Sequence, residues 1–259
     1  MGQNEMDRPD KRRFGFNAYG WLSLRMDLKN ITAIVPVKNE ERNIIAFLKS
    51  LPPAVRLIVI DSGTDRTRSL IRITRSNHTE VIVRDCNIPE ARQLGAEAAT
   101  TRWLLYTDAD IRFADDYFEH LRNWLPDSRT GAVMGAKLSL DKYRLYYRLY
   151  AWSMGLGARV RLPLGSGSNM LIRKEALKDA GGFDPRLTVN EDTYIFWQIQ
   201  KAGWRVRYEK NLKVYETDHR RLEQGVWRKY RHSVSRLFRL YTGWGKERVF
   251  KDDQGYWTQ

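Results

Sequence analysis

The residues with the clearest chemical potential in this sequence are two aspartates, Asp108 and Asp110, at the end of an apolar run. On an extended chain, residues i and i+2 point to the same side. Two carboxylates on one side of a strand end can bind a hard divalent cation together with phosphates. Because Asp-x-Asp tripeptides are also common in loops and helix caps, the surrounding sequence decides what the pair does.

Two kinds of segment alternate through the first half of the chain. Short apolar runs rich in β-branched residues predict strands, and longer runs with apolar residues on one side predict helices. The predicted strands are residues 31–37, 55–60, 80–83 and 103–106, and the predicted helices are residues 40–51, 67–75 and 89–100. Their alternation predicts right-handed βαβ units and a mostly parallel sheet with helices on both faces.

Polar clusters follow three of these strands, at residues 36–40, 61–67 and 108–110. Parallel strands end at the same edge of a sheet, and ligands of such sheets bind outside that edge. We therefore expect the three clusters, including the aspartate pair, to lie together on the ligand-binding edge.

The pattern changes after residue 110. Helices are expected at residues 113–125, 174–180 and 191–202, and strands at residues 133–140, 170–172, 204–208 and 214–215. The glycine- and serine-rich residues 165–169 predict a flexible loop that enters a strand.

Composition limits the partners and the compartment. The net charge of +14 indicates an anionic partner, such as nucleic acid, an acidic membrane face or a phosphorylated substrate. The one cysteine, Cys86, excludes an intrachain disulfide and fits a reducing compartment. The N-terminus shows no secretory signal, and no apolar window is long enough for a transmembrane helix.

Several short motifs occur in an order that resembles family-2 glycosyltransferases. They are the strand and turn at residues 34–41, the Asp-Ser-Gly-Thr-Asp of residues 61–65, the Ala-Arg-Gln-Leu-Gly of residues 91–95, the Asp-Ala-Asp of residues 108–110, the Gly-Gly-Phe-Asp of residues 181–184 and the Asn-Glu-Asp of residues 190–192. Ser62 and Gln93 depart from the usual acid and asparagine. The resemblance covers roughly residues 31–219, and its strength lies in order and spacing.

This resemblance implies an α/β fold of the GT-A type, which is a Rossmann-type mixed sheet flanked by helices. It also implies metal-dependent, inverting transfer of a sugar from a nucleotide-diphosphate sugar. The implied organisation is an N-terminal extension (residues 1–29), a catalytic domain (30–219) and a C-terminal segment (220–259). Within the domain, residues 30–112 would bind the nucleotide and residues 113–219 the acceptor.

The resemblance also assigns roles at the reacting end of the site. Asp110, with Asp108, would hold Mg²⁺ or Mn²⁺ on the diphosphate, and His219 would be a further ligand. Asp192 would be the general base, with Glu191 as the alternative. Against these roles, a Glu-Asp pair at a helix start also matches the helix dipole, and a lone histidine is usually a surface residue.

The nucleotide-sugar pocket is assigned in the same way. Its expected residues are Pro36, Val37, Asn39, Glu40, Asp61, Arg92 and Asp108. Asp61 would accept hydrogen bonds from the base or ribose, whereas Asp65 is expected to cap the helix that begins near residue 67. Turn formation is the other interpretation of Asp61.

The C-terminal segment is basic, and its apolar and aromatic residues recur at helical spacing. An amphipathic helix of this kind either packs on the domain or lies on an anionic membrane surface. Together with the aromatic, arginine-bearing residues 143–152, it favours a lipid-linked or glycan acceptor and a cytoplasmic location, peripheral on the inner membrane face. No nucleic-acid motif is present, so nucleic acid is not an expected partner. A catalytically degenerate nucleotide-sugar-binding protein on a membrane is the alternative.

Overall fold

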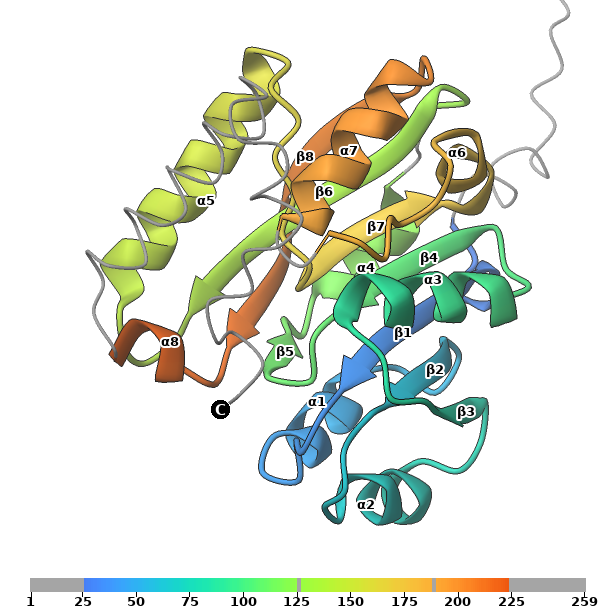
Figure 1. Ribbon diagram of the computed structural model, residues 1–259. Coiled ribbons are helices and arrows are strands. Elements are labelled where there is room, and N and C mark those ends of the chain that lie inside the picture. The colour runs from blue at the N-terminus through green and yellow to red at the C-terminus, as the bar shows by residue number, and fades with distance from the viewer. Residues whose placement is uncertain (1–25, 125–126, 188–189, 224–259) are drawn as a thin grey trace, which may run out of the picture.

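The computed structural model describes residues 26–124, 127–187 and 190–223. One eight-stranded mixed sheet runs through this part of the chain, in the order β3-β2-β1-β4-β7-β6-β8-β5. Helices lie on both of its faces (Figure 1). The sheet is therefore a central layer with a separate apolar core on each side.

The first half of the sheet is parallel. Its strands are β1 (Ile31–Val37), β2 (Arg56–Asp61), β3 (Thr79–Val83) and β4 (Trp103–Thr107), connected by α1 (Ile44–Ser50), α2 (Thr67–Thr74) and α3 (Ile88–Ala98). Strands β1, β2 and β4 are almost wholly apolar because both of their faces are covered. The three polar clusters follow β1, β2 and β4 at one edge, as predicted.

The second half makes the sheet mixed. Strand β7 (Asn169–Arg173) runs antiparallel to β4 and to β6 (Thr130–Ser139), while β8 (Arg205–Glu216) runs parallel to β6 and antiparallel to the short β5 (Ile111–Phe113). The remaining elements are η1 (Leu28–Asn30), α4 (Tyr117–Asn123), α5 (Arg144–Arg159), α6 (Lys174–Asp179), α7 (Glu191–Lys201) and α8 (Arg220–Glu223).

The two cores have different helices. On one face α1 and α4 contribute Phe47, Leu48, Tyr117 and Phe118. On the other face α3, α6 and α7 contribute alanines, leucine, isoleucines and Phe196. A parallel-type sheet needs such double cover because its strands carry apolar side chains on both faces.

Two elements differ from the sequence-based expectation. The helix predicted at residues 113–125 is present but shorter, as α4 (Tyr117–Asn123), and the unpredicted short strand β5 (Ile111–Phe113) precedes it, with Ile111 and Phe113 buried and Arg112 exposed. The two strands predicted at residues 204–208 and 214–215 are one long strand, β8. A shift in its register with β6, between Gly135 and Ala136, accommodates the polar residues that had suggested a break.

The side chain of Asn169 supports this register shift. Its Nδ2 donates to the carbonyl oxygens of Ala136, at 3.3 Å, and Leu212, at 2.9 Å, and its Oδ1 accepts from the Tyr117 hydroxyl at 2.8 Å. A Cβ on Gly135 would lie 2.1 Å from Asn169 Nδ2, so only glycine fits there. Asn169 thus provides hydrogen-bond donors to two backbone carbonyls at the register shift.

Two sequence-based predictions fall mostly outside the described residues. These are the N-terminal extension, of which residues 26–29 are described, and the amphipathic helix beyond residue 223. Met26 and Leu28 are buried and pack on the core of the α1 face. Within the described ranges, no helix has the length and apolar character needed to span a bilayer.

Candidate active site

Strand topology gathers the site at the edge where β4 ends. The antiparallel pairing of Thr107 with Asn169 places the start of β7, and residues 165–168 before it, beside Asp108. The carboxyl ends of β6 and β8 reach the same edge, since Ser139 pairs with Glu216 and Ile111 of β5 pairs with Glu216 from the other side. The two halves of the sequence therefore meet along this edge.

Arg92 connects the acids of the two halves. Its side chain is only 2% exposed, and its Nη1 lies 2.5 Å from Glu191 Oε1 while Nη2 lies 3.6 Å from Asp108 Oδ1. Burial disfavours its charge, but Glu191 and Asp108 outweigh burial and raise the pKa of Arg92. Close packing of α3 on β1 positions it, because a Cβ on Gly95 would lie 2.3 Å from Ile34 Cγ2.

The glycine-rich segment at residues 165–169 is packed, not flexible as its composition predicted. A Cβ on Gly167 would lie 1.9 Å from Arg92 Nη2, and one on Gly165 would lie 2.4 Å from the Asp192 carbonyl oxygen. The Gly165 N–H donates to Thr193 Oγ1 at 3.2 Å. Its glycines therefore provide room for Arg92 and for the start of α7.

Asp192 lies at the head of α7 against this segment. Its Oδ2 accepts from the Gly167 N–H at 3.0 Å, and its Oδ1 accepts from the Thr193 N–H at 2.7 Å. Burial, followed by the charge of Glu191, raises the pKa of Asp192 to about 7, although Arg92 and the two hydrogen bonds oppose the rise. A carboxylate with such a pKa can accept a proton near neutral pH.

The aspartate pair belongs to a second group of charges at the same edge. Asp108 Oδ2 accepts from Ser168 Oγ at 2.6 Å, and Ser168 Oγ accepts from Lys137 Nζ at 2.9 Å. Lys137 also forms an ion pair with Glu216. Burial disfavours the lysine charge, but Glu216, Asp110 and Asp108 outweigh burial and raise the pKa of Lys137.

The donor set fits a divalent cation in part. Asp108 and Asp110 supply two carboxylates, and Mg²⁺ is commonly held by one or two carboxylates plus substrate phosphates. His219 Nε2 lies 2.8 Å from Asp141 Oδ1, which leaves the buried Nδ1 as the free ring nitrogen, in the manner of an oriented metal ligand. Among the described residues, however, no three His, Cys, Asp or Glu side chains are gathered as a metal cluster, so His219 stays a prediction.

The predicted nucleotide pocket is an organised turn system beyond β1 and β2. Asp61 is 2% exposed, and its carboxylate accepts from the Gly63 N–H at 2.8 Å and from Arg68 Nε at 2.9 Å. Asn39, with φ of 58°, accepts from the Thr64 N–H at 2.9 Å. Asp61 thus shapes the turn, and its contact with a ribose or base stays a prediction.

Other residues of this pocket lie close by. The Glu40 N–H donates to Thr67 Oγ1 at 2.9 Å, and Val37 is buried at the end of β1 beside half-buried Pro36. The N-cap residue of α2 is Arg66, and Asp65, one residue before it, accepts through Oδ1 from the N–H of Thr67, the first residue of the helix.

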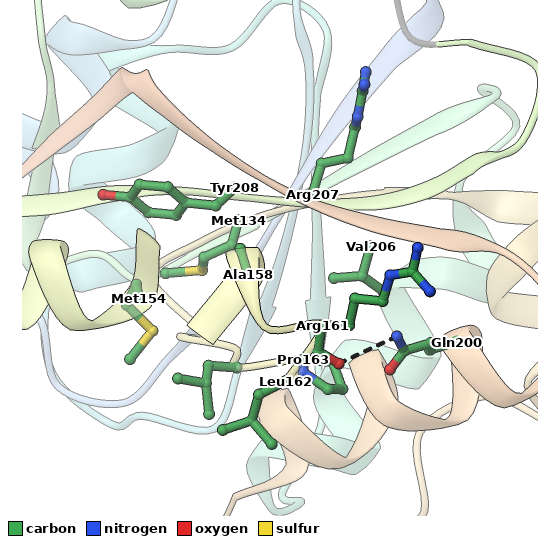
Figure 2. Close-up of a pocket in the computed structure, with 11 residues that line it drawn as sticks. Met134, Met154, Ala158, Arg161, Leu162, Pro163, Gln200, Val206, Arg207 and Tyr208 are labelled. Carbon is green, nitrogen blue, oxygen red and sulfur yellow. Dashed lines mark hydrogen bonds between the residues drawn. The ribbon is translucent and has the colours of Figure 1, made fainter. Parts of the chain in front are cut away.

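Two hollows lie outside this cluster of charges. A pocket of about 450 Å³ is lined by residues 180–186 with Tyr194 and Gln198, which is the segment assigned to the acceptor. Gln93 Oε1 accepts from the Phe183 N–H at 3.0 Å and ties this segment to α3. The other hollow, of about 40 Å³, lies between α5, β6, β8 and α7 (Figure 2). It has room for about three water molecules and is too small for a sugar.

A sequence model described as glycosyl transferase family 2 matches residues 32–181, more than half of the chain. The chain belongs to glycosyl transferase family 2. The matched range contains Arg92, Asp108 and Asp110 and ends before Asp192. The family predicted from the order of the motifs is therefore confirmed.

Curated relatives and solved structures agree with this membership. The pre-mycofactocin glycosyltransferase of Mycobacterium tuberculosis (strain H37Rv) is 26% identical over 212 residues, which cover 74% of this chain and 43% of that protein. The succinoglycan biosynthesis protein ExoA of Rhizobium meliloti is 26% identical, with 83% of this chain and 68% of that protein covered. The chain thus spans less than half the length of the first relative and about two thirds of the second.

Among solved structures, the mannosyltransferase PcManGT from Pyrobaculum calidifontis, in complex with GDP-Man and Mn²⁺, has a TM-score of 0.59 at 22% identity and covers 73% of this chain and 56% of that chain. Residues 1–349 of Staphylococcus aureus TarS, in complex with UDP-GlcNAc, have a TM-score of 0.61 at 17% identity, covering 73% and 58%. These likenesses confirm the predicted GT-A-type fold.

Sequence reasoning missed three side chains of the site. Ser168 lies in the segment interpreted as a flexible loop, Glu216 directly follows the strand predicted at residues 214–215, and Lys137 lies inside the strand predicted at residues 133–140. The available signal was Lys137 itself, because a lysine in an otherwise apolar strand rarely lacks a charged partner.

Proposed function

We propose that this chain transfers a sugar from a nucleotide-diphosphate sugar to an acceptor hydroxyl or phosphate, with inversion. The observation that carries the proposal is that two groups of charged residues lie next to each other: the acids at the head of α7, Glu191 and Asp192, and the aspartate pair Asp108 and Asp110. Arg92 forms ion pairs with Asp108 and with Glu191, and Asp192 is the next residue after Glu191, so the acids of both groups lie at one edge of the sheet. A transfer site needs a group for the leaving diphosphate and a base for the acceptor within reach of one anomeric carbon.

The roles then follow from the contacts. Asp192 takes the proton from the acceptor hydroxyl, because its carboxylate has a pKa raised to about 7, while Glu191 is engaged with Arg92. Asp108 and Asp110 would hold Mg²⁺ or Mn²⁺, which supplies Lewis-acid stabilisation of the leaving diphosphate. Residues 36–40 with Asp61 would bind the nucleoside, and the pocket at residues 180–186 would bind the acceptor.

Asp110→Asn, compared with Asp115→Asn, tests the metal-dependent activity. Asp115 is exposed five residues further along the chain and serves as the matched control. With UDP- and GDP-sugars and Mn²⁺, we expect Asp110→Asn to release nucleoside diphosphate about a hundredfold more slowly than wild type or more, since a bound metal contributes several kcal/mol. Full activity of Asp110→Asn in chelator would refute the proposal.

We further propose that the acceptor is reached at a membrane surface through α5. Its exposed apolar residues recur within an arc of about 80° on the helix: Leu145, Leu149, Trp152, Leu156 and Val160. The exposed Arg144, Arg148 and Arg159 lie along one side of this stripe. An apolar stripe flanked by arginines is complementary to an anionic bilayer surface, and a lipid-linked acceptor would be presented there.

Vesicle flotation tests this membrane contact. We expect the protein to float with phosphatidylglycerol vesicles and far less with phosphatidylcholine vesicles, and Leu149→Ser/Trp152→Ser to weaken flotation severalfold. Ile73→Ser/Val83→Ser is the control, since both residues are exposed but lie away from α5. Unchanged flotation of the α5 variant, with a lower melting temperature, would instead assign the stripe to packing within the chain.

A further inference from the structure

Strand β6 carries one lysine, Lys137, whose side chain is turned into the site. The side chain is 12% exposed, and its ammonium group donates to Ser168 Oγ at 2.9 Å and forms an ion pair with Glu216. The same Ser168 hydroxyl donates to Asp108 Oδ2 at 2.6 Å. One hydroxyl group therefore separates the ammonium from the acid assigned to the diphosphate end of the site.

The charges around this lysine are unbalanced. Asp108, Asp110 and Glu216 surround it, while Arg92, the other cation near Asp108, is paired at closer range with Glu191. The three carboxylates and one ammonium therefore carry a formal charge of −2. One divalent cation would make this group neutral. Lys137 thus does not replace the metal, because a charge of −2 remains around it after its own charge is counted.

The ammonium also keeps a donor to give. An ammonium group has three N–H donors; in the described structure Lys137 donates one to Ser168 and pairs with Glu216 through its charge. A phosphate oxygen that entered between Lys137 and the aspartate pair would accept a hydrogen bond from a remaining N–H of this ammonium group. Burying a lysine in a sheet is costly, and an apolar side chain would serve a purely structural role at lower cost.

We propose that Lys137 binds the diphosphate of the nucleotide donor directly, as a built-in cation beside the Asp108–Asp110 pair, so that the diphosphate still binds when divalent cations are removed. The proposal rests on the function proposed above. It adds a contact to the leaving group from β6, which belongs to the half of the domain assigned to the acceptor and not to the nucleotide-binding half. Metal and lysine then divide the diphosphate charge between them.

Wild-type protein provides the first test, by calorimetry of UDP and GDP with uridine and guanosine as controls. In EDTA, we expect the preferred nucleoside diphosphate to bind about tenfold more tightly than its nucleoside, or better, with a further gain in Mn²⁺. Diphosphate binding that appears only with Mn²⁺ overturns the role of Lys137. Absence of binding in both conditions contradicts the proposed function itself, so the two failures are distinguishable.

Lys137→Met provides the second test, with Lys178→Met on the exposed side of α6 as the control. In EDTA we expect about a tenfold loss of affinity for the diphosphate and no change for the nucleoside. Mn²⁺ alone should bind this variant more tightly, because the charge of the group becomes −3. A purely structural lysine would lower the melting temperature and leave the ratio of diphosphate to nucleoside affinity unchanged, which overturns the proposal.

A third pair of variants distinguishes loss of the diphosphate contact from misfolding. Lys137→Met/Glu216→Gln removes both members of the buried ion pair and so leaves no uncompensated charge. We expect it to lose diphosphate affinity in EDTA as Lys137→Met does, whereas Lys137→Arg should keep most of it. Wild-type affinity in the double variant overturns the proposal.

Discussion

The raised pKa of Asp192 makes the strongest prediction about the pH dependence of transfer. The pKa stands at about 7, compared with 3.8 for an unperturbed aspartate, and burial and then Glu191 are the causes that raise it. A base must be ionised to accept a proton, so kcat/KM should fall about tenfold for each pH unit below 7. At pH 6, about one tenth of the Asp192 carboxyl groups are ionised.

Glu191→Gln tests why the pKa of Asp192 is raised. Burial is the larger cause and Glu191 the smaller, so removing the Glu191 charge should lower the pKa of Asp192 only in part. The loss of Glu191 also frees Arg92 to pair with Asp192, which lowers that pKa further. We therefore expect the acidic limb of the pH profile of kcat/KM to move to lower pH by about one pH unit. Glu175→Gln, at the exposed start of α6, is the matched control and should leave the limb in place.

Asp192→Asn gives an independent reading through stability. The folded protein disfavours the ionised form, so the contribution of this group to stability is present below about pH 4 and is lost as the pH rises through about 7. Asparagine does not ionise, so the unfolding free energy of the variant relative to wild type should increase by about 2.5 kcal/mol from pH 5 to pH 8. Two results would refute the role of Asp192 as the general base: an acidic limb of the kcat/KM profile that does not move in Glu191→Gln, or wild-type activity in Asp192→Asn.

Two further predictions concern the packing that supports the site. Gly167→Ala would place a Cβ 1.9 Å from Arg92 Nη2 and displace the guanidinium from its buried ion pair with Glu191. We expect kcat to fall about a hundredfold and the unfolding free energy to fall by about 3 kcal/mol. Gly155→Ala, whose Cβ would meet Tyr208 at 3.3 Å, should be nearly neutral in both measurements. In urea denaturation, Asn169→Leu should lower the unfolding free energy by about 3 kcal/mol or more. The reason is that it leaves the Tyr117 hydroxyl and two buried carbonyl groups unpaired. If the unfolding free energy falls no further than in the control Asn123→Leu, at an exposed position, Asn169 does not stabilise the register shift.

Much of this site could be predicted from residue types and spacing. The alternation of strands and helices places Asp61 and Asp108 on one edge, because parallel strands end together, and the Glu-Asp motif identifies the head of α7. The sequence could not supply the antiparallel insertion of β7 between β4 and β6. That pairing is a long-range contact, and it alone brings Ser168 to Asp108 and the end of β6 to the site.

Local composition also misled in one place for a physical reason. Glycine and serine in residues 165–168 permit flexibility, but the same lack of side chains permits close approach of other groups. Arg92 and the first turn of α7 occupy that space. A glycine needed for contact and a glycine needed for motion cannot be distinguished without the partners, which lie far away in the sequence.

The continuity of the sheet has a consequence for how the protein opens and closes. β4 and β7 are joined by five paired residues in the centre of the sheet, so the nucleotide-binding and acceptor halves share one hydrogen-bonded ladder. Rotation of one half against the other would break that ladder, which excludes the hinge-bending mechanism used by enzymes with two separate lobes. Donor entry and product exit must then be gated by the segments beyond the strand ends, and thermal unfolding of both halves should be a single cooperative event.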